Sequence, residues 1–244
     1  MSKLGMAVEK ADYFLESAKW YTKDGADANK VILYFYGGEF ETLNSESYQA
    51  AVSNFIDTVG YTALLFRCAP ASGISAAAAI NESAQVYLRL LEQGYQPKDI
   101  VFVGDRTGGG IEICTLAKLR DEGIPLPAAC VAFSPNLDMT SSLLLDPAGL
   151  FGNPAGLPPI MIHAGYQDEM YDDVIRFGEI AESFSADIRI RIWKGLSHVC
   201  PLLASRSEGS MEAIKQADVF IRQNQQKGSG IAAALLYMTM FSIL

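Results

Sequence analysis

The chain has 244 residues, half of them hydrophobic and 19% charged, and 28 acidic residues against 19 basic ones give a formal net charge of −9. This length and apolar content predict a folded domain with a real core and exclude an intrinsically disordered or collagen-like chain. The acidic balance disfavours nucleic acid as a partner, and no apolar run reaches the roughly 18 residues of a membrane span.

Short apolar runs alternate with segments of helical periodicity. A helix is expected over residues 8–21, before a strand over residues 30–36 (KVILYFY) that ends at Gly37 and Gly38. The other expected strands are residues 61–66, 99–103, 128–133, 159–164 and 187–193. The other expected helices are residues 47–59, 76–92, 107–120, 172–184 and 211–223. This alternation predicts an α/β fold with a mostly parallel central sheet and helices on both faces.

No internal repeat or linker divides residues 1–227, so they are interpreted as a single domain. Residues 228–244 are interpreted as an apolar C-terminal tail that starts with Gly228, Ser229 and Gly230. The run over residues 231–244 is short of the roughly 20 residues of a spanning helix. We expect it to pack on this domain or on a neighbouring chain, which leaves a homodimer open.

The four cysteines, Cys68, Cys114, Cys130 and Cys200, are dispersed and lack metal-ligand spacing. This usage predicts a reducing, cytoplasmic setting, and the charged N-terminal sequence lacks the apolar centre of a signal peptide. Neither a metal ion nor a cofactor is expected, and the predicted partner is a small-molecule ligand or substrate.

The residues that follow the strands are the ones that bear chemistry, because ligands bind at the carboxyl ends of strands in open α/β sheets. Four such segments are Tyr36-Gly37-Gly38-Glu39, Gly104-Asp105-Arg106-Thr107-Gly108, Gly165-Tyr166-Gln167-Asp168 and Gly195-Leu196-Ser197-His198. A glycine-rich strand-to-helix turn, a later Asp and a final His follow the order of an α/β-hydrolase triad.

Five segments resemble the hormone-sensitive-lipase-like group of α/β-hydrolase esterases. VILYFYGGEF resembles the oxyanion-hole segment that usually ends HGGGF, and FRCAP resembles YRLAP. DIVFVGDRTGGG resembles the nucleophile elbow, which is usually GDSAGG, and FSPNLDMTSS resembles the SPWxDLT segment. PPIMIHAGYQDEMYDD and WKGLSHV resemble the acid and histidine segments. The resemblance runs in order from about residue 31 to residue 223 and implies the α/β-hydrolase fold.

The resemblance implies site residues one by one. Asp168 matches the triad acid, His198 matches the triad base, and Gly37 and Gly38 match glycines of the oxyanion hole. Arg106, however, stands where the family has its serine nucleophile. A guanidinium is permanently protonated and only donates hydrogen bonds, so it cannot attack a carbonyl carbon.

Two more residues depart from the family pattern. Tyr36 stands in place of the histidine that opens the oxyanion motif, and Glu39 stands in place of its third glycine. A carboxylate at Glu39 would oppose a developing oxyanion. Thr107 is not expected to replace the serine because its side chain diverges from that position, although its backbone N–H is the part the family uses. Ser197 is interpreted as a loop hydroxyl, so ester hydrolysis is disfavoured.

Arg106 is expected to pair with an anion, which is Glu39, Asp168 or a ligand. The favoured hypothesis is non-hydrolytic acid/base chemistry on a small, anionic metabolite, of the cyclisation, isomerisation or lyase type. In it His198 and Asp168 form the base pair, Arg106 binds an anion or oxyanion, and Tyr36 offers a phenol. The alternatives are a catalytically dead ligand-binding pseudo-hydrolase, whose salt bridge plugs the site, and a weak carboxylesterase that uses water activated by His198.

Two further features of the sequence concern the cap over the pocket and the second histidine. Only 18 residues, 141–158, separate the SPNLDMT and PIM segments, where the family usually carries a longer insertion. The resemblance therefore implies a reduced cap over the pocket. His163, the other histidine, lies within an expected strand and is predicted to be a core residue.

Overall fold

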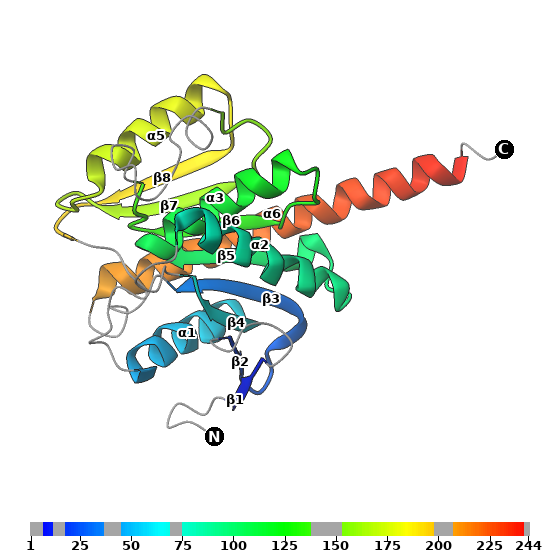
Figure 1. The fold of residues 1–244 in the computed structure, drawn as a ribbon, viewed down its shortest axis with the longest axis horizontal. Helices are drawn as coiled ribbons and strands as arrows, with labels where there is room; N and C mark the ends of the chain where they lie inside the picture. The colour runs from blue at the N-terminus through cyan, green and yellow to red at the C-terminus, as the bar shows by residue number, and fades with distance from the viewer. Residues whose placement is uncertain are drawn as a thin grey trace.

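The computed structural model describes residues 7–11, 18–36, 45–68, 75–137, 153–197 and 207–241. In these ranges eight strands form one sheet in the order β1-β2-β4-β3-β5-β6-β7-β8 (Figure 1). The strands are β1 (Ala7–Lys10), β2 (Lys19–Thr22), β3 (Asp27–Tyr36), β4 (Tyr61–Arg67), β5 (Ile100–Asp105), β6 (Ala129–Phe133), β7 (Ile160–Gly165) and β8 (Ile188–Trp193). Neighbours from β4 to β8 pair in parallel, which confirms the predicted parallel sheet.

Helices cover both faces of the sheet, as predicted (Figure 1). The described helices are α1 (Ser45–Val59), α2 (Ala76–Glu92), the short 3-10 helix η1 (Pro97–Asp99), α3 (Thr107–Asp121), α5 (Tyr171–Ser183) and α6 (Glu208–Phe241). On one face Phe55 of α1 and Phe220 of α6 share a core with Phe133 of β6. On the other face α2 and α3 pack over β5, where the Tyr87 ring of α2 meets Phe102 edge to face, and α5 packs over β7 and β8.

The central strands are buried on both faces, whereas the last strand lies at an edge. Every residue of β5 and β6 is buried, as expected for parallel strands between two helical layers. In β8, partly buried isoleucines alternate with the exposed Arg189 and Arg191. The Arg189 guanidinium lies 5.2 Å from the ring centre of Phe220, and that of Arg191 lies 5.5 Å from that of Trp193.

The predicted helix over residues 8–21 is wrong. Within that range the structure has β1 and β2, which pair antiparallel. β2 in turn pairs with β4, with Tyr21 opposite Ala63, and the Tyr21 side chain is buried. Pairing with the edge of β4 satisfies backbone groups and buries aromatic surface, so residues that had room for a helix form a strand instead.

The last helix continues well beyond the end predicted at residue 223. α6 has 34 residues and runs through Gly228 and Gly230, which corresponds to a length of about 51 Å. Figure 1 shows its C-terminal part extending away from the sheet. Among the described residues no helix is both long enough and apolar enough to cross a membrane. The division into a domain and a tail at residue 228 stays a prediction.

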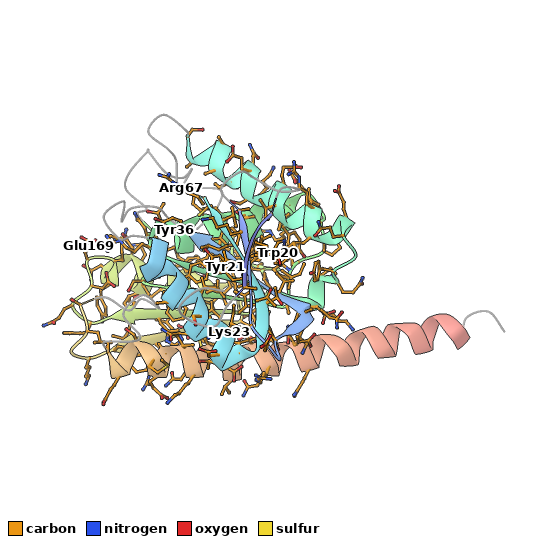
Figure 2. All side chains as sticks on the ribbon, turned by 90° about the horizontal axis from the view of Figure 1, so that it is seen from below. Trp20, Tyr21, Lys23, Tyr36, Arg67 and Glu169 are labelled. Atoms are coloured by element: carbon orange, nitrogen blue, oxygen red, sulfur yellow. The ribbon has the colours of Figure 1, made fainter. Side chains whose placement is uncertain are left out.

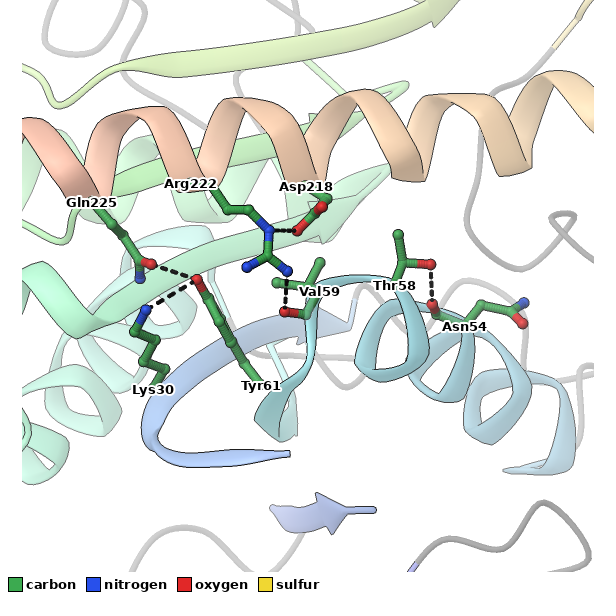
Figure 3. A network of polar contacts seen from close by, with 8 residues as sticks. All are labelled: Lys30, Asn54, Thr58, Val59, Tyr61, Asp218, Arg222 and Gln225. Carbon is green, nitrogen blue, oxygen red and sulfur yellow. Dashed lines mark hydrogen bonds and ion pairs between the residues drawn. The ribbon is translucent and has the colours of Figure 1, made fainter. Parts of the chain in front are cut away.

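The N-terminal part of α6 is tied to α1 and β4 by polar contacts (Figure 3). The Tyr61 hydroxyl donates a hydrogen bond of 2.5 Å to Oε1 of Gln225. Nη2 of Arg222 donates to the Val59 carbonyl oxygen at 2.9 Å, and its Nε donates to Asp218 Oδ1 at 2.8 Å. These contacts fix α6 against the face of the sheet that α1 also covers.

Candidate active site

The turn between β5 and α3 carries Arg106 in a strained conformation. Its φ of 48° and ψ of −121° lie where side chains other than glycine are rare. The backbone is held there because Arg106 N donates to the Phe133 oxygen at 3.1 Å, and Arg106 O accepts from Asn136 N at 2.8 Å. A sharp, strained strand-to-helix turn is the geometry of a nucleophile elbow.

The glycines around Arg106 allow this turn. A Cβ on Gly104 would lie 2.8 Å from the backbone carbon of Gly108, and one on Gly109 would lie 2.9 Å from Cβ of Pro135. Such distances are too short for real Cβ atoms, so α3 can start against β5 and the loop after β6 only without these side chains. The GDRTGGG segment therefore makes the turn through close backbone packing.

The Arg106 guanidinium forms an ion pair with Glu169. Arg106 Nη2 lies 2.7 Å from Glu169 Oε1, and the two side chains are 27% and 63% exposed, respectively. The expected protein partners were Glu39 and Asp168, so Glu169 is a site residue that the sequence analysis missed. The available signal was its place directly after Asp168, which brings a second carboxylate to the same loop.

Asp168 lies in a tight loop between β7 and α5. Its side chain is largely buried, and its Oδ1 accepts a hydrogen bond of 3.1 Å from the backbone N–H of Met170. The loop is bound to the segment after β8, because Tyr166 N donates to the Trp193 oxygen at 3.0 Å and Gln167 N to the Leu196 oxygen at 3.3 Å. These two hydrogen bonds hold the loop that carries Asp168 against the segment that precedes His198 in the sequence.

Four predicted site residues, Gly37, Gly38, Glu39 and His198, lie outside the described residues, as do residues 138–152 of the predicted reduced cap. The pairing of Asp168 with His198 therefore stays a prediction. In the part of the chain that the structure describes, no three His, Cys, Asp or Glu side chains are grouped as metal ligands.

The structure places Tyr36 and Thr107 at the same edge of the sheet as Arg106. Tyr36 ends β3, and its ring packs against the core that α1 and α6 cover. Its carbonyl oxygen accepts from Cys68 N at 3.0 Å. Thr107 is the buried first residue of α3. Figure 2 shows Tyr36 and Glu169 towards the same end of the molecule, with Lys23 farther away.

His163 is a core residue, as predicted. It is fully buried in β7, where its ring stacks on Phe133 and its Nδ1 accepts a hydrogen bond of 3.1 Å from Nε1 of Trp193. Burial, reinforced by the charge of Arg191, lowers the pKa of His163 to about 3. The ring is therefore neutral at physiological pH and packs as an aromatic group.

A second carboxyl group that the sequence analysis missed lies beneath the turn. Glu112 of α3 is fully buried, and neither of its oxygens makes a hydrogen bond of standard geometry with a described residue. Burial raises the pKa of Glu112 well above its usual range, and the nearby Asp105 raises it further. The Cys130 thiol and the Gly104 backbone act in the opposite direction without cancelling the burial effect.

Comparison with known proteins agrees with this geometry. Residues 32–149 match a family model described as the α/β-hydrolase fold. An acetyl-hydrolase from Streptomyces hygroscopicus is 27% identical over 246 residues, covering 87% of this chain and 81% of that protein. An esterase/lipase structure from an uncultured bacterium is 25% identical, with a TM-score of 0.78 and coverage of 91% and 86%.

A further similar structure is an esterase from the bacterial hormone-sensitive lipase family. It is 24% identical, has a TM-score of 0.77, and the match covers 91% of this chain and 85% of that one. This structural similarity shows the fold alone. The similarity in sequence to the acetyl-hydrolase adds a relationship to hydrolytic enzymes. The chain thus has the α/β-hydrolase fold and is related to acetyl-hydrolases and esterases.

Proposed function

We propose that this protein uses its hydrolase-fold site for non-hydrolytic acid/base chemistry on a small anionic metabolite, of the cyclisation, isomerisation or lyase type. In this proposal Arg106 binds a carboxylate or enolate oxygen, and His198, oriented by Asp168, accepts and returns a proton. No acyl-enzyme forms, because the residue at the elbow has no nucleophilic atom.

The observation that carries this proposal is the Arg106 side chain at the strained turn, paired with a carboxylate. A guanidinium remains protonated at all physiological pH values and offers only N–H donors. The 2.7 Å contact with Glu169 supports an anion-binding role, because the Arg106 guanidinium already binds a carboxylate that belongs to the chain itself. The strained turn holds Arg106 at the position where the resemblance implies the nucleophile.

The acid loop supports a role in proton transfer. Asp168 is largely buried and its Oδ1 accepts a backbone N–H at 3.1 Å, which keeps its carboxylate in one orientation. The backbone hydrogen bonds from Tyr166 and Gln167 tie this loop to the segment that precedes His198. A pure binding protein gains nothing from such an oriented acid, so these contacts favour chemistry over binding alone.

An ordinary esterase is the second candidate, because the relatives carry the names acetyl-hydrolase and esterase. In this chain it would need a water molecule activated by His198, since neither Arg106 nor Thr107 supplies a nucleophile at the elbow. A ligand-binding protein without catalysis is the third candidate. A labelling assay and a proton-exchange assay distinguish these three candidate functions.

The wild-type protein is expected to show no labelling by a fluorophosphonate, because this reagent needs an activated serine. Hydrolysis of p-nitrophenyl acetate should likewise equal the background of the His198→Ala variant. Intact-protein mass spectrometry measures the labelling, with an active serine esterase as the positive control for the reagent. Stoichiometric labelling of the wild type would contradict the proposal, and ester turnover that depends on His198 without labelling would favour the water-based esterase.

Proton transfer should be detectable on pyruvate, a small carboxylate with exchangeable protons next to a carbonyl. In D₂O the wild type is expected to exchange the methyl protons on the order of 100-fold faster than the His198→Ala and Arg106→Gln variants, measured by proton NMR. The Arg106→Gln variant tests whether the carboxylate must be held, and circular dichroism checks the fold of each variant. Equal rates in all three proteins would favour the ligand-binding alternative.

A further inference from the structure

Glu169 occupies the position on Arg106 that an incoming anion would take. The two side chains come from positions 63 residues apart, one at the elbow and one at the start of the segment that leads into α5. The Arg106 backbone is fixed by its hydrogen bonds to Phe133 and Asn136, which hold the base of this side chain at the turn. Glu169 belongs to a turn, and its side chain is directed from that turn towards the elbow.

The exposure of the two side chains is unequal. Arg106 is 27% exposed and Glu169 is 63% exposed, so most of the Glu169 carboxylate already contacts water. Moving Glu169 fully into solvent costs little, because ion pairs of this exposure contribute about 1 kcal/mol at most. A partly buried guanidinium is much less tolerant of losing an anion. Exchange of one carboxylate for another keeps the charge balanced, whatever else Arg106 contacts.

We infer that Glu169 is an internal competitor at the Arg106 site and that the natural ligand binds through a carboxylate that takes its place. The inference rests on the proposed role of Arg106 as the anion-binding residue, and it names the class of ligand. A planar carboxylate matches the donor geometry of a guanidinium. A neutral ester offers only a carbonyl oxygen, which does not replace the charge of Glu169, so the site selects acids over their esters.

The experiment is a binding titration with trifluoroacetate, which is ionised throughout the working pH range, followed by fluorine NMR at constant ionic strength. Glu169→Gln removes the competing charge and keeps the shape, so the Kd for trifluoroacetate should fall about two- to fivefold. Arg106→Gln should weaken binding at least about tenfold relative to the wild type. Glu182→Gln makes the same charge change on the exposed end of α5 and should leave the Kd unchanged.

Competition identifies the ligand class. Acetate is expected to displace trifluoroacetate from the Glu169→Gln variant at a lower concentration than inorganic phosphate or methyl acetate does. An unchanged Kd in Glu169→Gln, retained binding in Arg106→Gln, or stronger displacement by phosphate would each overturn the inference. None of these readouts depends on turnover or on fluorophosphonate labelling, so failure of the inference is distinguishable from failure of the proposed chemistry.

Discussion

Gly110→Ala is expected to lower the free energy of unfolding by about 3 kcal/mol, although alanine is the better helix former. A Cβ at this buried position would overlap the backbone carbonyl oxygen of Asn136. Asn136 is itself held by the hydrogen bond from its N–H to the Arg106 oxygen at 2.8 Å. Relief of the clash must therefore displace the loop after β6 or the elbow itself. Urea unfolding followed by circular dichroism measures the change.

Gly178→Ala is the matched control for this prediction. It also adds a methyl group to a helical glycine, but the atom that meets it is Cδ1 of Ile190, at the flexible end of a side chain. Rotation of that side chain relieves the contact, and the gain in helix propensity is about 1 kcal/mol. The stability of Gly178→Ala should stay within about 1 kcal/mol of the wild type. Equal losses in the two variants would show that backbone packing at the elbow is not the cause.

Glu112→Gln should stabilise the protein increasingly as the pH rises. The folded-state pKa of Glu112 lies well above its usual range, so once the pH exceeds the pKa of the unfolded state the unfolded chain releases a proton that the folded chain keeps. The unfolded state then binds fewer protons, and wild-type stability falls with a slope of about 1.4 kcal/mol per pH unit until the folded-state pKa is reached. Glutamine has no proton to release, so this contribution disappears.

The free energies of unfolding of the wild type and Glu112→Gln should therefore diverge as the pH rises above the usual range of a carboxyl pKa. All other titrating groups, His163 included, are common to both proteins and cancel in the difference. Glu182→Gln, which changes an exposed carboxylate on α5, should give a curve parallel to that of the wild type. Parallel curves for Glu112→Gln would instead show that Glu112 is ionised in the folded protein.

The central part of the fold could be predicted from local sequence because its signals are local. Fully buried parallel strands produce uninterrupted apolar runs such as residues 31–35, and glycine marks the turns that follow them. The N-terminal strands could not be predicted this way. The helix over residues 8–21 is expected only from the length of chain before the strand at residues 30–36, and the partner that makes β2 a strand is β4, about forty residues later in the chain. The continuation of α6 through two glycines was also missed, because glycine weakens a helix without always ending it.

The candidate site was predictable where a motif fixes the backbone, and much less so where side chains meet across loops. The GDRTGGG segment predicts a sharp turn at Arg106 and Thr107, and the structure has both residues at the turn between β5 and α3. Which carboxylate meets Arg106 depends on the path of the loop after β7, and sequence spacing does not specify that path. Glu112 was missed because an acidic residue among apolar ones in a helix is normally expected on the exposed face. The helix α3, however, is buried on nearly every side around Glu112.

The alternating pattern of β8 bears on how copies of the protein meet. Among the described residues β8 is the last strand of the sheet, and an edge strand presents backbone groups that can pair with a strand from another molecule. In an antiparallel pair of two β8 strands centred on Ile190, Arg189 of each copy would lie opposite Arg191 of the other, and like charges in opposed positions destabilise such pairing. Arg189 and Arg191 are also engaged over Phe220 and Trp193 and so resist being displaced. In that register the two arginines oppose continuation of the sheet from β8.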